Sequence, residues 1–158
     1  MKVTLLLVGK TVNKHLDALI EDYVQRIRHY LAFDVKIIPE LKSAKNLSIE
    51  QQKEKEGDLI LMQLKSNDYL ILLDERGTEF RSVDFASFLS KQFLVSSKQI
   101  VFLIGGPYGF SPNVYNRCQK MLSLSQMTFS HQMIRLLFTE QLYRALSIMH
   151  NEPYHHEG

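Results

Sequence analysis

The sequence predicts a single α/β domain built on a mostly parallel sheet. Short apolar runs alternate along the chain with longer segments whose apolar residues recur at helical spacing. The chain has 158 residues, of which 45% are hydrophobic and 23% charged, as is usual for a globular protein. It contains no repeat, no convincing linker and no apolar run of transmembrane length. We therefore expect one domain over residues 1–158.

The first half of the chain is expected to hold three strands and two helices. The strands are predicted at Lys2–Val8, Phe33–Pro39 and Tyr69–Leu73, with a turn at Asp74–Gly77 ending the third. One helix is predicted over His15–Tyr30 from the spacing of its apolar residues. A second begins at Ser48, which forms a capping box with Gln51 three residues later.

The second half continues the alternation of helix and strand. A helix is predicted over Ser82–Leu94 and a strand over Gln99–Ile104, followed by a glycine-rich loop. Ser111 and Pro112 are a good N-cap and first residue for another helix. A short strand near Leu122–Leu124 and a long helix over Ser130–His150 complete the prediction.

Two features favour the cytoplasm. The apolar opening Met1–Gly9 is short and is not followed by an A-x-A cleavage site, so a buried first strand is expected in place of a signal peptide. The single cysteine, Cys118, cannot form a disulfide within the chain and is expected to pack in a helix.

Positive charge is concentrated in the second half of the chain. The formal net charge is only +2, but six bases and one acid, Glu140, fall between Phe85 and Asn151. The bases are Lys91, Lys98, Arg117, Lys120, Arg135 and Arg144. Such an excess predicts an electropositive region that attracts a polyanion such as RNA. The alternative is a chance excess on a solvated face.

Three loops lie where ligands bind in open α/β sheets, beyond the carboxyl ends of strands: after Leu73, after Ile104 and after Leu124. In the second loop, Gly105-Gly106-x-x-Gly109 leaves main-chain groups open to a flat adenosine. The alternative is a tight turn without a ligand. The loop is neither a dinucleotide fingerprint nor a phosphate-binding P-loop.

The segment Leu124–Arg135 and the tail are the other candidate sites. His131 and Arg135 are four residues apart and share a helix face, beside a helix start that attracts anions. The simpler interpretation is a capping histidine and a surface arginine. In the tail, Tyr154 beside two histidines is suited to stacking a base, although a frayed terminus is the usual outcome. The histidines lack the further ligands of a zinc site, and no hydrolase motif is present.

Several short motifs occur in one order along the whole chain. They are Val8-Gly9-Lys10, Lys55-Glu56-Gly57, Leu72-Leu73-Asp74-x-x-Gly77, Ile104-Gly105-Gly106-Pro107-x-Gly109, Leu122-Ser123-Leu124-Ser125-x-Met127-Thr128, His131-x-x-x-Arg135, Glu140-Gln141-x-Tyr143-Arg144-Ala145 and Pro153-Tyr154-His155. In this order and spacing they resemble the ribosomal RNA large-subunit methyltransferase H family, the pseudouridine N3-methyltransferases of the SPOUT superfamily.

The resemblance implies a single-domain fold with a five- to six-stranded sheet, a trefoil knot near the C-terminus, and a homodimer. It implies that S-adenosylmethionine binds without a metal and that the substrate is 23S rRNA in the large subunit or the 70S ribosome. The residues expected to hold the methyl donor are Leu73, Gly105, Leu124, Ser125, Gln126, Met127, Thr128 and Phe129. Those expected on the RNA side are His131, Arg135, Arg144, Tyr154 and His155.

The resemblance also implies the chemistry. The methyl group passes directly from the sulfonium to N3 of a pseudouridine, and a neutral histidine, His155 or His131, is our hypothesis for the group that accepts the N3 proton. Arg135 or Arg144 would offset negative charge that develops on the base. The modest net charge fits a preassembled ribosomal particle, recognised by shape, better than naked RNA.

Two departures from the family and two alternative functions remain. Ser130 stands where the family has proline, and a shifted helix cap is expected there. His156 stands where the family has arginine or lysine, which puts one phosphate contact in doubt. The alternatives are a nucleotide- or phosphate-binding regulatory module without catalysis, and a SPOUT enzyme with another substrate, such as the ribose of transfer RNA.

Overall fold

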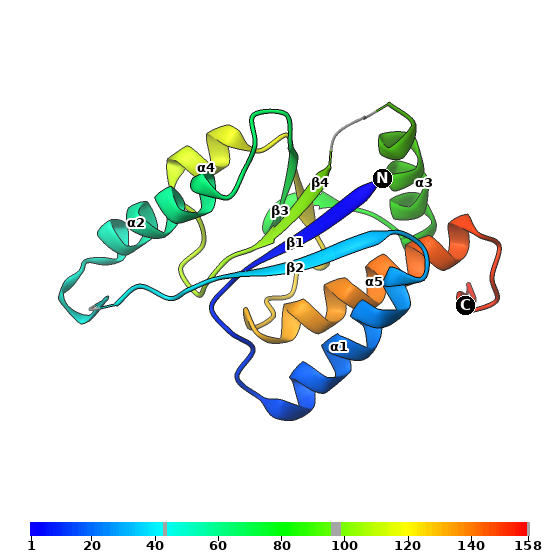
Figure 1. Ribbon diagram of the computed structural model, residues 1–158, viewed down its shortest axis with the longest axis horizontal. Helices are drawn as coiled ribbons and strands as arrows, with labels where there is room; N and C mark the ends of the chain where they lie inside the picture. Colours follow the sequence, from blue (N-terminus) through cyan, green and yellow to red (C-terminus); the bar gives the residue numbers. More distant parts are fainter. Residues whose placement is uncertain (43, 96–98, 158) are drawn as a thin grey trace.

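Five parallel strands form one sheet in the order β2-β1-β4-β3-β5 (Figure 1). The computed structural model describes residues 1–42, 44–95 and 99–157. The strands are β1 (Lys2–Val8), β2 (Ala32–Ile38), β3 (Tyr69–Glu79), β4 (Ile100–Ile104) and β5 (Lys120–Ser123). The predicted α/β class with a parallel sheet is therefore confirmed.

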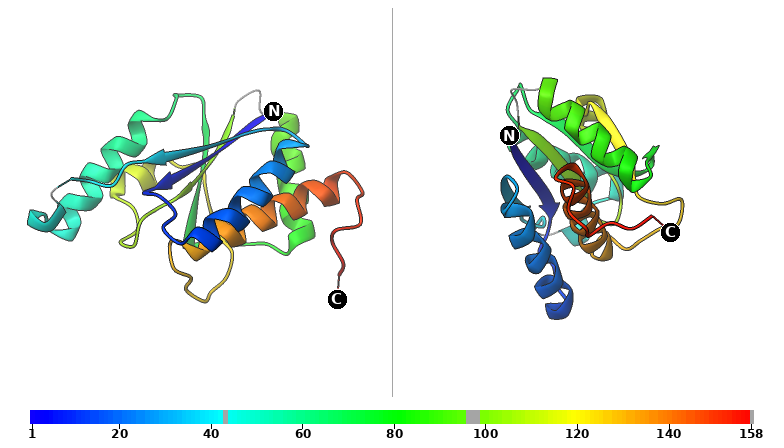
Figure 2. Two further views of the ribbon diagram at one scale, coloured as in Figure 1. Left: turned by 60° about the horizontal axis from the view of Figure 1, so that its bottom comes forward. Right: turned by 90° about the vertical axis from the view of Figure 1, so that its right-hand side faces the viewer.

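Helices cover both faces of the sheet (Figures 1 and 2). Over the described residues they are α1 (Lys14–Arg28), the 3-10 turn η1 (Ala44–Asn46), α2 (Ile49–Met62), α3 (Ser82–Val95), α4 (Pro112–Arg117) and α5 (Met133–Met149). Helix α5 packs between α1 and α3 on one face, whereas α2 and α4 pack together on the other. None of these helices is long and apolar enough to cross a membrane.

The apolar strand sequences follow from this two-sided burial. In β1, Val3, Leu5 and Leu7 pack into the core beneath α1, α3 and α5, while Leu6 and Val8 pack into the core on the α2 side. Because successive side chains of a strand point to opposite faces, a strand covered on both faces becomes apolar throughout. Strand β4 shows the same effect, since all five of its residues are buried.

Strand β3 is longer than its apolar pattern predicts. The expected turn at Asp74–Gly77 is a bulge within the strand: Leu73 and Thr78 both pair with Leu122 of β5, and residues 74–77 loop out between them. At Gly77 a Cβ atom would lie 2.5 Å from the carbonyl carbon of Met121, so the bulge packs directly on the β5 backbone. Pairing with β5 thus extends β3 beyond Leu73.

Helix α5 begins at Met133, three residues later than predicted. Ser130 nevertheless organises its first turn, because its hydroxyl accepts a hydrogen bond from the Met133 amide at 3.0 Å and its carbonyl accepts one from the Ile134 amide at 3.0 Å. The shifted cap expected from Ser130 is therefore present. Strand β5 covers Lys120–Ser123, not Leu122–Leu124, and its last residues lead into the loop before α5.

Candidate active site

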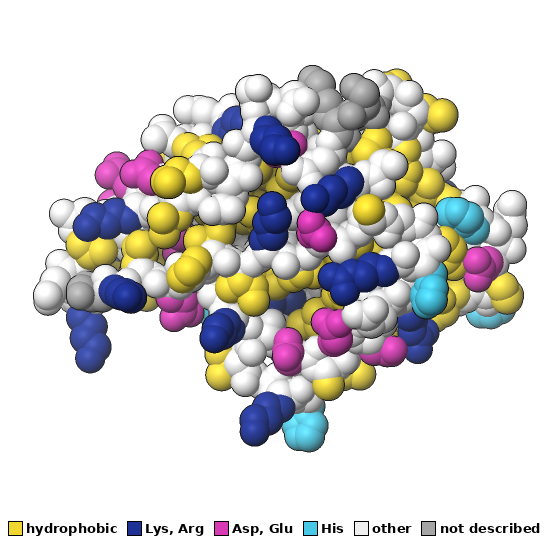
Figure 3. All heavy atoms as spheres, in the orientation of Figure 1, with side chains coloured by type: hydrophobic (Ala, Val, Ile, Leu, Met, Phe, Trp, Pro, Cys, Tyr) yellow, Lys and Arg dark blue, Asp and Glu magenta, His cyan; other side chains and the backbone are white. Residues whose placement is uncertain are grey.

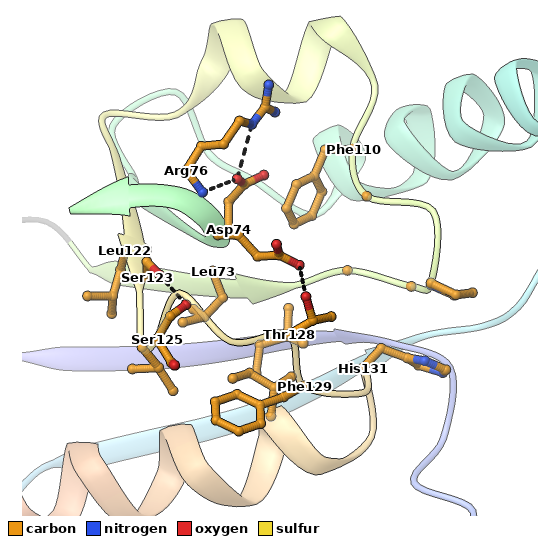
Figure 4. A pocket seen from close by; sticks show the side chains of 18 of the residues that line it. Leu73, Asp74, Arg76, Phe110, Leu122, Ser123, Ser125, Thr128, Phe129 and His131 are labelled. Carbon is orange, nitrogen blue, oxygen red and sulfur yellow. Dashed lines mark hydrogen bonds and ion pairs between the residues drawn. The ribbon is translucent and has the colours of Figure 1, made fainter. Parts of the chain in front are cut away.

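A cavity of about 360 Å³ opens at the carboxyl edge of the sheet (Figure 4). Strand β3 lies between β4 and β5 in the sheet, so the segments that follow these three strands meet there. The lining residues are Leu73, Asp74, Glu75, Arg76, Ile104, Gly105, Gly106, Pro107, Gly109, Phe110, Leu122, Ser123, Leu124, Ser125, Met127, Thr128, Phe129, His131 and Ile134. The three loops singled out in the sequence therefore form one site.

Seven of the eight residues expected to hold a methyl donor line this cavity. They are Leu73, Gly105, Leu124, Ser125, Met127, Thr128 and Phe129; the exception is Gln126, which is not among the lining residues. His131, expected on the RNA side, also lines the cavity. Met127 is 76% exposed and Phe129 is 38% exposed, so the loop presents two apolar side chains that no core residue covers.

Local hydrogen bonds fix the shape of the loop after β5. The Ser123 hydroxyl donates to the Ser125 carbonyl at 2.9 Å, and the Ser125 hydroxyl accepts from the Met127 amide at 2.9 Å. On the opposite wall, a Cβ atom at Gly105 would lie 2.8 Å from the Phe110 ring. Glycine at this point therefore leaves room for the Phe110 ring, which also lines the cavity.

Sequence reasoning missed three charged residues of the cavity wall, Asp74, Glu75 and Arg76, because it assigned them to a turn. Asp74 accepts a hydrogen bond from the Tyr115 hydroxyl at 2.5 Å. It also forms an ion pair with Arg76, whose Nε lies 3.3 Å from Asp74 Oδ1. Burial alone would raise the pKa of Asp74, but the hydrogen bonds and the Arg76 charge lower it below the usual range of an aspartate. Their position directly after a buried strand was the signal that could have identified them.

The resemblance implied that Arg135 lies on the RNA side, and the simpler interpretation made it a surface arginine. The structure supports neither expectation. The Arg135 side chain is fully buried. The guanidinium donates to the carbonyls of Val8 at 2.7 Å, Gly9 at 2.9 Å and His131 at 3.2 Å, and to the Thr11 hydroxyl at 3.1 Å. Burial lowers its pKa, an effect that the Glu40 carboxylate opposes. Arg135 thus joins the start of α5 to the end of β1.

The other residues expected on the RNA side form a separate tail cluster, made of Arg144, Tyr154 and His155 around Glu140. Arg144 Nη2 lies 2.6 Å from Glu140 Oε1, and the Tyr154 hydroxyl donates to the same oxygen at 3.0 Å. Arg144 Nη1 lies 3.1 Å from His155 Nδ1. Because an arginine only donates, His155 Nδ1 accepts this bond and Nε2 carries the proton. The tail is docked on α5 through these contacts.

The tail cluster does not line the cavity, since none of Glu140, Arg144, Tyr154 and His155 is among the lining residues. His131 precedes this helix of 17 residues and His155 follows it. The tail then folds back along the helix, so the cluster lies against the middle of α5, at Glu140 and Arg144. Figures 1 and 2 show the chain terminus at the far end of α5 from the loop that precedes it. Within one chain, Arg144, Tyr154 and His155 are therefore not brought to the cavity.

The excess of bases in the second half of the chain does not form a continuous basic surface. Arg117 donates to the carbonyls of Lys65 and Asp68, and Lys120 lies over the rings of Phe80 and Phe88. Together with buried Arg135, these side chains serve contacts within the fold; Lys98 lies outside the described residues. On the face drawn in Figure 3, basic side chains are interspersed with acidic ones.

The described part of the chain contains no group of three or more His, Cys, Asp or Glu side chains placed to hold a metal ion. The thiol of Cys118, at the end of α4, lies 3.2 Å from the Tyr115 carbonyl, and burial raises its pKa. A protonated, half-buried thiol is a poor nucleophile.

The fold and the cavity define a class of protein: a parallel α/β domain with a cavity where three neighbouring strands end, the usual place of a ligand site in such folds. The chain belongs to the SPOUT methyltransferase family, since the family model described as "Predicted SPOUT methyltransferase" matches residues 1–155.

The relatives that match almost the whole chain share one name. The chain is 59% identical over 157 residues to the ribosomal RNA large subunit methyltransferase H of Phocaeicola vulgatus, and 55% identical over 157 residues to that of Flavobacterium johnsoniae. Each match covers 99% of this chain and 100% of the relative. A probable methyltransferase from Bordetella pertussis has a similar fold, with a TM-score of 0.58 at 9% identity over 91% of this chain and 93% of the other.

Proposed function

We propose that this methyltransferase binds S-adenosylmethionine in the cavity and methylates N3 of a pseudouridine in 23S rRNA, within the large subunit or the 70S ribosome in the cytoplasm. One observation carries the proposal: seven residues selected as donor contacts, from three separate loops, line a single cavity. The names of the relatives, ribosomal RNA large subunit methyltransferase H, support RNA as the acceptor.

The cavity residues suit such a donor. A volume of about 360 Å³ is that of a site for one small molecule. Leu73, Leu124 and Ile134 offer apolar surface to an adenine, and Gly105 and Gly106, which have no side chains, also line the cavity and could offer main-chain groups to the rest of the nucleoside. Binding of this donor needs no lysine or arginine side chain that is free of an acidic partner. In this it differs from binding of a phosphate ligand.

The reaction requires little covalent chemistry from the protein. The methyl–sulfur bond breaks with its electron pair remaining on sulfur, the methyl carbon bonds to N3, and the N3 proton passes to a base. The protein must align donor and acceptor and receive that proton. Of the two histidines considered, His131 is the better candidate, because it lines the cavity and Arg144 occupies the free nitrogen lone pair of His155.

Within one chain, Arg144, Tyr154 and His155, which we expect on the RNA side, do not line the cavity. We propose a homodimer in which the tail cluster of one protomer faces the cavity of its partner. Exposed apolar side chains near the start of α5 support self-association: Val12 is 81% exposed and Met133 is 43% exposed. These residues are held close together, since the Gln132 side chain bonds the Val12 amide at 2.9 Å and the Lys10 carbonyl at 3.1 Å.

Mixing two inactive variants tests this arrangement. Gly105→Trp fills the cavity, and removal of residues 153–158 deletes the tail. If each site combines one cavity with the partner's tail, an equal mixture regains about a quarter of the wild-type activity, because half of the dimers are mixed and each carries one intact site. Activity that stays at the level of the separate variants would contradict the shared site.

Two measurements test the function itself. Calorimetry is expected to show one S-adenosylmethionine site per chain, with affinity abolished by Gly105→Trp; a regulatory module that binds phosphate would bind inorganic phosphate or a nucleotide instead. Mass mapping of ribosomal RNA from a strain lacking the protein should reveal one pseudouridine that has lost a methyl group. A lost methyl group on transfer RNA ribose would identify the alternative substrate.

A further inference from the structure

The bulge of β3 brings a carboxylate with no cationic partner into the cavity. Of the titratable side chains in the described cavity lining, Asp74 and Arg76 pair with each other, His131 stands at the start of α5, and Glu75 forms no ion pair. Its one hydrogen bond is from the Thr128 hydroxyl at 3.2 Å. The cavity wall therefore carries one uncompensated negative charge.

The position of Glu75 follows from the bulge. Leu73 and Thr78 are fixed on the β5 ladder, so residues 74–77 must project from the sheet edge. The hydrogen bond to Thr128, drawn in Figure 4, joins this bulge to the loop after β5, which forms another wall of the same cavity. The carboxylate thus lies between the bulge and the loop after β5, at the wall of the cavity.

We infer that Glu75 makes the cavity selective for a sulfonium donor over the thioether left after methyl transfer. This inference rests on the proposed function. S-adenosylmethionine carries one more positive charge than S-adenosylhomocysteine, and that charge is on the sulfur at the centre of the molecule, between its adenosine and amino-acid halves. The Glu75 carboxylate joins two walls of the cavity, so a donor held between these walls would bring its sulfonium into the field of this charge. Loss of the sulfonium charge then weakens binding of the product and favours its release.

The expected contribution of the Glu75 charge to donor affinity follows from Coulomb's law. Two unit charges at close contact attract by about 1 kcal/mol in water and by more in a partly dry site, which corresponds to a change in affinity of about fivefold or more. Because the carboxylate is exposed, the lower part of this range applies. Glu75 would therefore act on selectivity, while most of the binding energy comes from the other contacts of the cavity.

Calorimetry with S-adenosylmethionine and S-adenosylhomocysteine tests the inference. Glu75→Gln is expected to weaken binding of S-adenosylmethionine about fivefold and to change binding of S-adenosylhomocysteine less than twofold. Glu79→Gln is the matched control, since it removes one negative charge from the same strand at an exposed residue outside the cavity lining; it should change neither affinity.

Three results would overturn the inference. Equal weakening of both ligands in Glu75→Gln would mean that the residue contacts their shared amino group or only shapes the loop. The same pattern of loss in Thr128→Val would mean that the hydrogen bond, not the charge, carries the effect. An unchanged ratio of the two affinities would remove the role altogether. If the wild-type protein bound neither compound, the proposed function would fail instead, so the two failures are distinguishable.

Discussion

The phenolic oxygens of Tyr23 on α1 and Tyr154 in the tail lie 3.1 Å apart. Because the Tyr154 hydroxyl donates its proton to Glu140, it can only accept from Tyr23, so the direction of the bond is fixed. Burial and hydrogen bonds to Tyr23 and Glu140 raise the pKa of Tyr154, so this phenol stays protonated at neutral pH. Helix α1 thereby takes part in holding the tail cluster.

Tyr23→Phe should loosen the tail without affecting the cavity. Loss of one hydrogen bond costs about 1 kcal/mol of tail docking, which lowers rRNA methylation at saturating donor by up to about fivefold. Hydrogen exchange at residues 153–157 should become faster, while the affinity for S-adenosylmethionine stays within twofold of wild type. Tyr69→Phe, which removes a phenol at the start of β3, serves as the control. Unchanged exchange at the tail would show that Tyr23 does not anchor it.

Arg135→Met should destabilise the whole fold. The substitution leaves the carbonyls of Val8, Gly9 and His131 without their guanidinium donor, and we expect unfolding to become easier by about 3 kcal/mol in urea titrations. Arg81→Met is a control at an exposed ion pair, and its unfolding should match wild type. A variant of Arg135 with normal stability but impaired RNA binding would support a role of Arg135 in RNA binding, against the conclusion drawn from its burial.

The stabilising effect of Asp74 should disappear in acid. Because its folded-state pKa is lowered, the carboxylate contributes stability at higher pH that is lost as the pH falls through the folded-state value. Asp74→Asn should thus be less stable than wild type at neutral pH and similar to it in strong acid. Tyr115→Phe removes one cause of the shift and should move the onset of this loss to higher pH. Urea unfolding at a series of pH values checks both, and a difference between Asp74→Asn and wild type that does not vary with pH would contradict the assignment.

Gly77→Ala should separate the bulge from β5. Its Cβ atom would lie 2.5 Å from the backbone of Met121, and relieving such an overlap costs about 2 kcal/mol of stability. Since β5 leads into the cavity loop, affinity for S-adenosylmethionine should fall as well. At Gly106 the nearest atom to an added Cβ is 3.6 Å away, so Gly106→Ala should unfold like wild type. Equal thermal stability of the two variants would argue against the close packing at Gly77.

The sequence was informative where burial dictates composition. The apolar runs of β1 and β4 identified central strands, because strands covered on both faces need apolar residues at every position. The loops after Leu73, Ile104 and Leu124 could be selected as a site because ligands bind at carboxyl ends of parallel strands. Resemblance to a family added the individual donor residues, and its trefoil knot remains a prediction.

The errors arose where distant contacts outweigh local pattern. Residues 74–77 have the composition of a turn, and only pairing of Thr78 and Glu79 with β5 makes the segment part of a strand. Arg135 has the spacing of a site residue, and arginine is usually exposed. Its burial depends on carbonyls at the end of β1, more than 120 residues earlier in the chain, which no local reading of α5 includes.

The bulge of β3 is anchored at both ends on a single residue, Leu122. Side chains at positions 74–76 can therefore be exchanged while the strand on either side keeps its register. These residues belong to the cavity wall, so the wall can vary there while the paired strands around it keep their positions. Redesign of the enzyme toward donors with larger transferable alkyl groups would best begin there.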